Sequence, residues 1–163
     1  KLAVVTQTTL SVDDAAEITA AVKARFPHVR EPKQQDICYA TQNRQDAVKL
    51  MSKAVDVVIV VGSPTSSNSN RLREVALKLG TDAYMVDSAE ELRAEWIEGK
   101  TRIGLTAGAS APDILVQQVI ERLRALGALS VRKLDGVEET IKFPLPKGLK
   151  LDTAGESSLG HLS

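Results

Sequence analysis

Three short polar segments stand where an apolar run ends and an amphipathic run begins. They are residues 6–9 (TQTT), 62–70 (GSPTSSNSN) and 106–110 (TAGAS). In α/β proteins ligands bind at the carboxyl ends of parallel strands, where helix N-termini present free N–H groups and a partial positive charge that suit phosphate. Helix capping alone explains one such loop. Because the segment 62–70 holds four serines and two asparagines, more donors than a cap needs, the pattern predicts an anion site.

Cys38 is the only cysteine and the second candidate for chemistry. It lies in residues 36–44 (DICYATQNR), directly before a predicted helix start, where helix N–H groups stabilise a thiolate. Two interpretations stay open: a small buried apolar side chain, which is the commoner role, or a reactive or metal-binding thiolate. One cysteine excludes an internal disulfide, favours a reducing compartment, and cannot by itself supply the thiolates of an iron–sulfur cluster.

Other familiar sites fail on inspection. Residues 99–101 (GKT) resemble the end of a phosphate-binding P-loop, but Ala94 stands where that motif requires its first glycine. No G-x-G-x-x-G segment follows an apolar run. His28 and His161 are expected to be solvated, so no serine–histidine–acid arrangement can be built, and Trp96 is expected to be a packing residue.

The runs that carry these residues alternate between strand and helix. Apolar runs predict strands at residues 2–5, 55–61, 83–86 and 102–106, with weaker strand-like runs at 131–134 and 140–143. Helices are predicted from Ser11 to Pro27, after a Thr41 cap, along the stripe from Leu72 to Leu79, over 88–97, and from a start bracketed by Ser110 and Asp113. This alternation predicts an α/β fold of repeated strand–helix units with small, mostly parallel sheets.

Apolar residues at helical spacing predict which helix faces are buried. The first helix is expected to bury Ala15, Ile18, Val22 and Phe26, and the last helix to bury Ile114, Leu115, Val119, Leu123 and Leu126. Pro112 is expected in the first turn of that last helix. The charged, proline-bearing loop around residues 30–35 is the best candidate for a domain boundary, and the polar residues 151–163 predict a loose tail.

Composition excludes several classes of function. The 163 residues carry 21 basic and 21 acidic side chains, and this balance argues against a broad nucleic-acid-binding surface. No apolar run approaches the roughly 18 residues of a membrane span. The chain opens with Lys1 directly before an apolar run, so we expect a fragment or a processed chain.

Four segments together resemble one family, the 4-hydroxy-3-methylbut-2-enyl diphosphate reductases (the IspH/LytB family). They are residues 5–14, 36–45, 61–71 and 104–113, in the family's order, and the resemblance covers nearly everything up to about Pro146. It implies a trefoil-like architecture of three α/β units, of which this chain holds the C-terminal half. Residues 1–33 would end the second unit, 34–146 would form the third, and 147–163 would be a flexible C-terminal tail.

The resemblance also implies a cofactor, a 4Fe-4S type cluster held by three cysteines. Cys38 matches the last of the three and would be an iron ligand. The other two cysteines, the histidines near the diphosphate and the catalytic glutamate belong to the missing N-terminal half. The chain alone is therefore expected to be inactive.

Carried over position by position, Ser66, Asn68 and Ser110 would hold the substrate diphosphate, with Ser67 assisting. Thr8 would lie near the substrate hydroxyl as a catalytic residue for water positioning and proton relay. The implied reaction is reductive dehydroxylation of (E)-4-hydroxy-3-methylbut-2-enyl diphosphate to isopentenyl and dimethylallyl diphosphate, the last step of the methylerythritol phosphate route to isoprenoids. The implied electron donor is ferredoxin or flavodoxin, in a bacterial cytoplasm or the plastid stroma.

Two alternatives stand beside this hypothesis. A stand-alone α/β module that binds a phosphate ester without a cluster would use the same polar loops, and Cys38 would then be an ordinary core residue. A structural remnant without a ligand would use the polar side chains only as helix caps.

Overall fold

A run of β-branched residues forms the central strand β1 (Val57–Val61) of the computed structural model, which describes residues 1–32 and 36–134. β1 pairs in parallel with β2 (Asp82–Val86) on one side and β3 (Ile103–Ala107) on the other. The remaining elements are α1 (Val12–Arg25), α2 (Tyr39–Ser52), α3 (Ser67–Lys78) and α4 (Asp113–Ala125), with the short 3₁₀ turns η1 (Ala89–Glu91) and η2 (Ala94–Trp96). The predicted α/β class with a small parallel sheet is confirmed.

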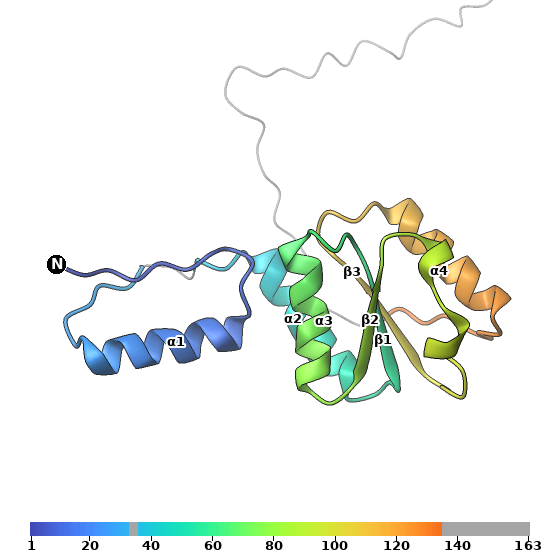
Figure 1. The fold of residues 1–163 in the computed structure, drawn as a ribbon, viewed down its shortest axis with the longest axis horizontal. Helices are drawn as coiled ribbons and strands as arrows, with labels where there is room; N and C mark the ends of the chain where they lie inside the picture. The colour runs from blue at the N-terminus through green and yellow to red at the C-terminus, as the bar shows by residue number, and fades with distance from the viewer. Residues whose placement is uncertain (33–35, 135–163) are drawn as a thin grey trace, which may run out of the picture.

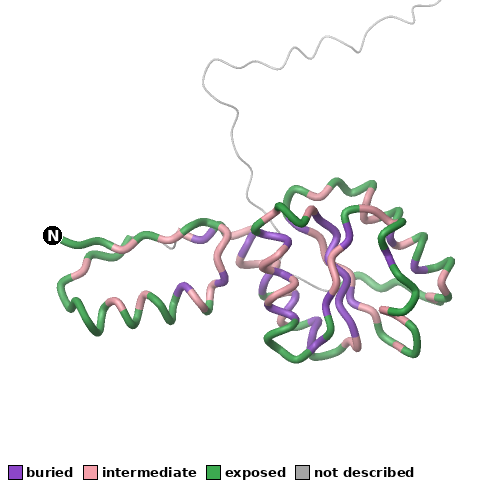
Figure 2. Tube along the Cα trace, viewed as in Figure 1, coloured by how far each residue is buried: buried purple, intermediate pink, exposed green. Residues whose placement is uncertain are grey.

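β1 is buried on both faces because helices cover both sides of the sheet. Side chains alternate along a strand, so Val58 and Val60 pack against α2 and α3, whereas Val57, Ile59 and Val61 pack toward α4 and the 3₁₀ turns. Figure 2 shows the buried centre of the sheet, and all five residues of β1 have no exposed surface. The result is a three-layer body that orients every strand-to-helix loop in one direction.

The residues before α2 form an arm that extends away from this body (Figure 1). A single parallel bridge pairs Ala3 with Arg30, and α1 runs beside the two extended segments. The predicted buried strand at residues 2–5 is wrong, because Val5 is 78% exposed and no sheet forms there among the described residues. The arm therefore has no complete core within the described part of the chain.

The predicted helix α1 forms, but its buried stripe is largely wrong. Ser11 caps it as expected, accepting a hydrogen bond from the Asp14 amide, and Ala15 is buried. Ile18 is 60% exposed and Phe26 is also exposed, because only the two extended segments of the arm face this helix. The apolar residues of α1 thus form a face that the other described residues leave exposed.

Several smaller expectations also differ from the structure. Thr41 is not a helix cap, because α2 begins two residues earlier with Cys38 at the N-cap position. The helix predicted over 88–97 is the two turns η1 and η2, and residues 131–134 form no strand. Pro112 occupies the N-cap of α4 rather than its first turn, and Ile114 is 63% exposed. The predicted strand at 140–143 and the tail lie outside the described residues.

Two predictions about single aromatic and apolar residues hold. Trp96 is a packing residue, stacked on Tyr84 with ring centroids 4.4 Å apart. Val119 and Leu123 bury the inner face of α4 against the sheet. No helix of the described residues is long and apolar enough to cross a bilayer.

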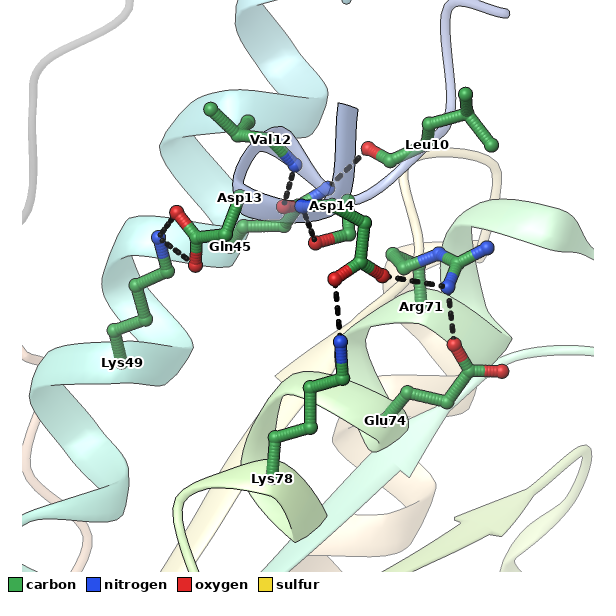
Figure 3. Close-up of polar contacts among 10 residues, drawn as sticks. Leu10, Val12, Asp13, Asp14, Gln45, Lys49, Arg71, Glu74 and Lys78 are labelled. Atoms are coloured by element: carbon green, nitrogen blue, oxygen red, sulfur yellow. Dashed lines mark hydrogen bonds and ion pairs between the residues drawn. The ribbon is translucent and has the colours of Figure 1, made fainter. Parts of the chain in front are cut away.

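The arm joins the body through polar contacts at the start of α1 (Figure 3). Gln45 of α2 accepts a hydrogen bond from the Val12 amide (3.0 Å) and donates one to the Leu10 carbonyl (2.8 Å). Ion pairs on the surface flank this contact and link Asp13 to Lys49 of α2, and Asp14 to Lys78 and Arg71 of α3. One helix start on the arm is thereby tied to two helices of the body.

Acid should weaken this junction through Asp14. The hydrogen bond from Lys78 holds the pKa of the Asp14 carboxyl below its usual range, although partial burial opposes this. Because the folded-state pKa is the lower one, the ionised carboxylate stabilises the fold above about pH 4, and this contribution is lost as the pH falls through the folded-state pKa. We expect Asp14→Asn to lower the free energy of unfolding at pH 6 but to make little difference near pH 2, as measured by urea unfolding at both values. The Lys78→Met variant should lose the same pH dependence of the free energy of unfolding. An equal effect of Asp14→Asn at both pH values would contradict the assignment of this dependence to Asp14.

Candidate functional site

The polar loops gather at one edge of the sheet. Because β1 and β3 are parallel neighbours, their carboxyl ends meet there, and the N-termini of α2, α3 and α4 lie at the same edge in Figure 1. The amide of Gly108 donates to the carbonyl of Val61, which joins the loops that follow the two strands. Residues 62–70 and 106–110 contain no charged side chain, so this edge presents neutral hydrogen-bond donors.

Two glycines allow the first turn of α3 to lie directly on the strand ends. A Cβ atom on Gly62 would come within 2.2 Å of Ser69 Oγ and 2.8 Å of Ser69 Cβ. A Cβ atom on Gly108 would also come within 2.2 Å of Ser69 Oγ. The Ser69 side chain is buried between both glycines, which brings the N-terminus of α3 against both loops.

Asn68, in the first turn of α3, has a buried side-chain amide. It is only 7% exposed, and its side-chain nitrogen and oxygen are both buried without a hydrogen-bond partner among the described residues. A buried polar group left in that state costs about 1–3 kcal/mol, so a hydrogen-bonding ligand or water at this position would stabilise it. Ser66, the N-cap of α3, accepts hydrogen bonds from the amide and hydroxyl of Ser69, which leaves its own hydroxyl hydrogen free to donate. Ser67 is exposed beside it.

Thr8 and Cys38 lie together at the start of α2. The Cys38 amide donates to the Thr8 carbonyl at 3.1 Å, and Asp36 accepts a hydrogen bond from the Thr6 amide at 2.7 Å. Both the Thr8 side chain and the Cys38 thiol are exposed. The exposure of Cys38 contradicts the interpretation of this residue as a buried apolar side chain. In the described part of the chain no three histidine, cysteine or acidic side chains cluster in a way that could hold a metal.

Ser110 is exposed in the turn that precedes α4, two residues before the Pro112 N-cap. No hydrogen bond of its side chain to another described residue is seen. Its loop lies next to the site. The Ala111 amide donates a hydrogen bond to the Gly108 carbonyl, and Gly108 lies beside both Ser69 and Asn68. The structure thus brings Ser66, Ser67, Asn68 and the Ser110 loop to one edge.

The sequence does not single out two residues that shape the site, Ser69 at the sheet edge and Gln45 in α2. The pattern marks Ser69 only as one of the donors of its loop, although its side chain lies against both Gly62 and Gly108. The pattern gives Gln45 no role, although this residue is fully buried and shares the inner face of α2 with Thr41 and Val48. A polar residue in the register of a buried stripe was the available signal.

A model of the LytB protein family matches residues 1–124 of this chain, which include every one of these residues. The chain belongs to the LytB family. Two solved structures share the LytB fold. They are an E-1-hydroxy-2-methyl-but-2-enyl-4-diphosphate reductase from Plasmodium falciparum (37% identical, TM-score 0.72, covering 74% of this chain and 38% of that one) and an (E)-4-hydroxy-3-methyl-but-2-enyl diphosphate reductase (35% identical, TM-score 0.53, covering 76% and 43%).

Curated LytB relatives are more similar still. A protein from a Polaromonas species named 4-hydroxy-3-methylbut-2-enyl diphosphate reductase is 81% identical over 155 residues, which are 95% of this chain and 46% of the relative. A Ralstonia nicotianae protein of the same name is 69% identical over 152 residues, 93% of this chain and 47% of the relative. The chain spans about half the length of the curated relatives it matches.

The contact between Gly62 and Ser69 can be tested by a pair of compensating changes. Gly62→Ala should lower the free energy of unfolding by about 1–3 kcal/mol, because the new methyl group overlaps the Ser69 side chain. Ser69→Gly alone should cost about 1 kcal/mol through helix propensity. Together the two changes should cost clearly less than their sum in urea unfolding, because the overlap is gone. Strictly additive losses would contradict the close contact.

Proposed function

We propose that this chain is the C-terminal half of an iron–sulfur 4-hydroxy-3-methylbut-2-enyl diphosphate reductase and that it is inactive without the N-terminal half. The proposed reaction takes up two electrons and two protons, breaks the allylic carbon–oxygen bond, and releases water with isopentenyl or dimethylallyl diphosphate. The observation that carries the proposal is Asn68, a buried amide without a partner at the N-terminus of α3, in a chain of the LytB family.

The diphosphate would be bound by the uncharged hydrogen-bond donors at the edge of the sheet. Asn68 would donate its amide hydrogens, and Ser66 the hydroxyl hydrogen that its own contacts leave free. Ser67 and Ser110 are exposed on the two sides of this turn and would complete the contacts. The N-terminus of α3 adds main-chain N–H groups and the positive end of its dipole, so an anion is stabilised without a lysine or arginine.

Cys38 is the one residue of this chain proposed to hold the 4Fe-4S cluster. It fits that role in part, because its thiol is exposed and makes no capping hydrogen bond at the N-cap of α2. One thiol is not enough for a cluster, so the other cysteines must come from the N-terminal half. When bound, the cluster would supply electrons and an open iron that acts as a Lewis acid on the leaving hydroxyl. Ferredoxin or flavodoxin is the proposed source of the electrons, in the cytoplasm of a bacterium.

Thr8 is proposed to act on the substrate hydroxyl. Its carbonyl is held by the Cys38 amide, so its loop stays beside the cysteine while its exposed hydroxyl can exchange a proton or hold a water. In this arrangement the diphosphate lies on α3 and the reacting end of the substrate points toward Thr8 and Cys38.

The division into units is also proposed. Residues 1–33 would end a second α/β unit and residues 34–146 would form a third, in a trefoil-like protein, with 147–163 as a tail. The arm supports this division, because Val5, Ile18 and Phe26 are apolar and exposed there while the body has its own core. The N-terminal half is the proposed cover for these side chains.

The proposal is tested by two variants of the full-length protein that contains this chain. After anaerobic reconstitution, Cys38→Ser should lose cluster iron and turnover because an iron ligand is gone. Asn68→Ala should keep its iron but raise the KM for the substrate by about 10–100-fold, the effect of one lost hydrogen bond to a charged group. Iron per chain, visible absorption and steady-state kinetics are the measurements.

Each variant serves as the control for the other. If Cys38→Ser retains full iron and turnover, the ligand assignment is wrong. If the unaltered protein takes up no iron yet binds diphosphates or sugar phosphates tightly in calorimetry, the chain is a phosphate-ester-binding module instead. If Asn68→Ala changes only stability, by about the 0.5–2 kcal/mol of a lost cap, the site is a structural remnant.

A further inference from the structure

We propose that Gln45 is a positioning residue for the loop of residues 6–10, and that through this loop it sets where Thr8 meets the substrate. The inference rests on the proposed function, because it gives Thr8 a reacting partner. The inference starts from a polar side chain in an apolar environment. Gln45 has no exposed surface and shares the inner face of α2 with core residues such as Val48.

Both ends of the Gln45 amide are used, and both contact main chain of the arm. The Oε1 atom accepts from the Val12 amide at 3.0 Å, and Nε2 donates to the Leu10 carbonyl at 2.8 Å. Val12 is the first residue of α1, so its amide has no acceptor within the helix. Glutamine matches this pair of groups because it carries a donor and an acceptor on one side chain. A hydrocarbon of the same size would leave two part-buried main-chain groups unpaired.

Two contacts, at its middle and at its C-terminal end, hold this loop against a single helix. The Thr8 carbonyl accepts from the amide of Cys38, the N-cap of α2, and Leu10 is held by Gln45, seven residues further along. At a rise of about 1.5 Å per residue, the two anchors lie roughly 10 Å apart along one rigid element. The loop therefore cannot shift relative to Cys38 without breaking one of them.

The ion pairs around Gln45 are weaker anchors. The Asp13 and Lys78 side chains are more than half exposed, and exposed pairs contribute about 0–1 kcal/mol. Figure 3 shows that these pairs flank the central glutamine contact. The contact of the buried Gln45 side chain is better shielded from water and salt, so it is a stronger anchor of the loop than these ion pairs. Positioning of this kind matters because a small misplacement of a reacting group can cost on the order of 100-fold in rate.

The test uses Gln45→Met in the full-length protein, because methionine conserves the unbranched shape without either hydrogen bond. The matched control is Val48→Ala, one turn further along the same buried face, which destabilises the core without touching the loop. We expect Gln45→Met to lower kcat by about 10–100-fold, to change the KM for the diphosphate substrate by less than about twofold, and to leave iron per chain unchanged. Val48→Ala should leave both kinetic constants unchanged.

Hydrogen exchange in the iron-free protein gives a readout that does not depend on turnover. The amides of Val12 and Cys38 should exchange at least about tenfold faster in Gln45→Met than in Val48→Ala, because their acceptors are on Gln45 and on the loop it holds. Equal exchange and equal kcat in the two variants would overturn the positioning role while leaving the reductase proposal intact. If the unaltered protein has neither cluster nor turnover, the reductase proposal fails, and the exchange of these two amides alone decides the role of Gln45.

Discussion

Burial of β1 on both faces is the constraint on which the rest of the structure depends. A strand of valines and isoleucine must be covered by helices on both sides, and parallel pairing with β2 and β3 then turns the strand ends toward one edge. Gly62 and Gly108 remove the side chains that would hold α3 away from that edge. The proposed anion site thus depends on core packing and would be completed by the uncharged donors of α3.

The helix α2 connects this core to the proposed reactive end of the site, at Cys38 and Thr8. Its inner face packs on the sheet through Val48 and Met51, its N-cap is Cys38, and Gln45 holds the loop that carries Thr8. A cluster ligand and a proton-handling residue would therefore move together with the body. This arrangement explains how a reaction site shared between separate units of a protein could stay aligned.

The body was predictable from sequence because its signals are local. The continuous β-branched run marked β1, and the serine- and asparagine-rich segment after it marked the turn that holds Asn68. The arm was not predictable in the same way. Residues such as Ile18 recur at a helical spacing that predicts burial, but no described residue covers them. The roles of Gln45 and Ser69 could not be predicted because they depend on tertiary contacts. Gln45 binds main chain of the arm, and Ser69 packs against glycines that lie in other segments.

The most direct test of the account is a map of iron in the full-length protein with its substrate. Diffraction data would be collected at the iron absorption edge from crystals grown without oxygen. We predict an anomalous peak bonded to the Cys38 sulfur and a diphosphate hydrogen-bonded to the Asn68 amide at the sheet edge. An iron site remote from Cys38, or a diphosphate bound away from the N-terminus of α3, would contradict it.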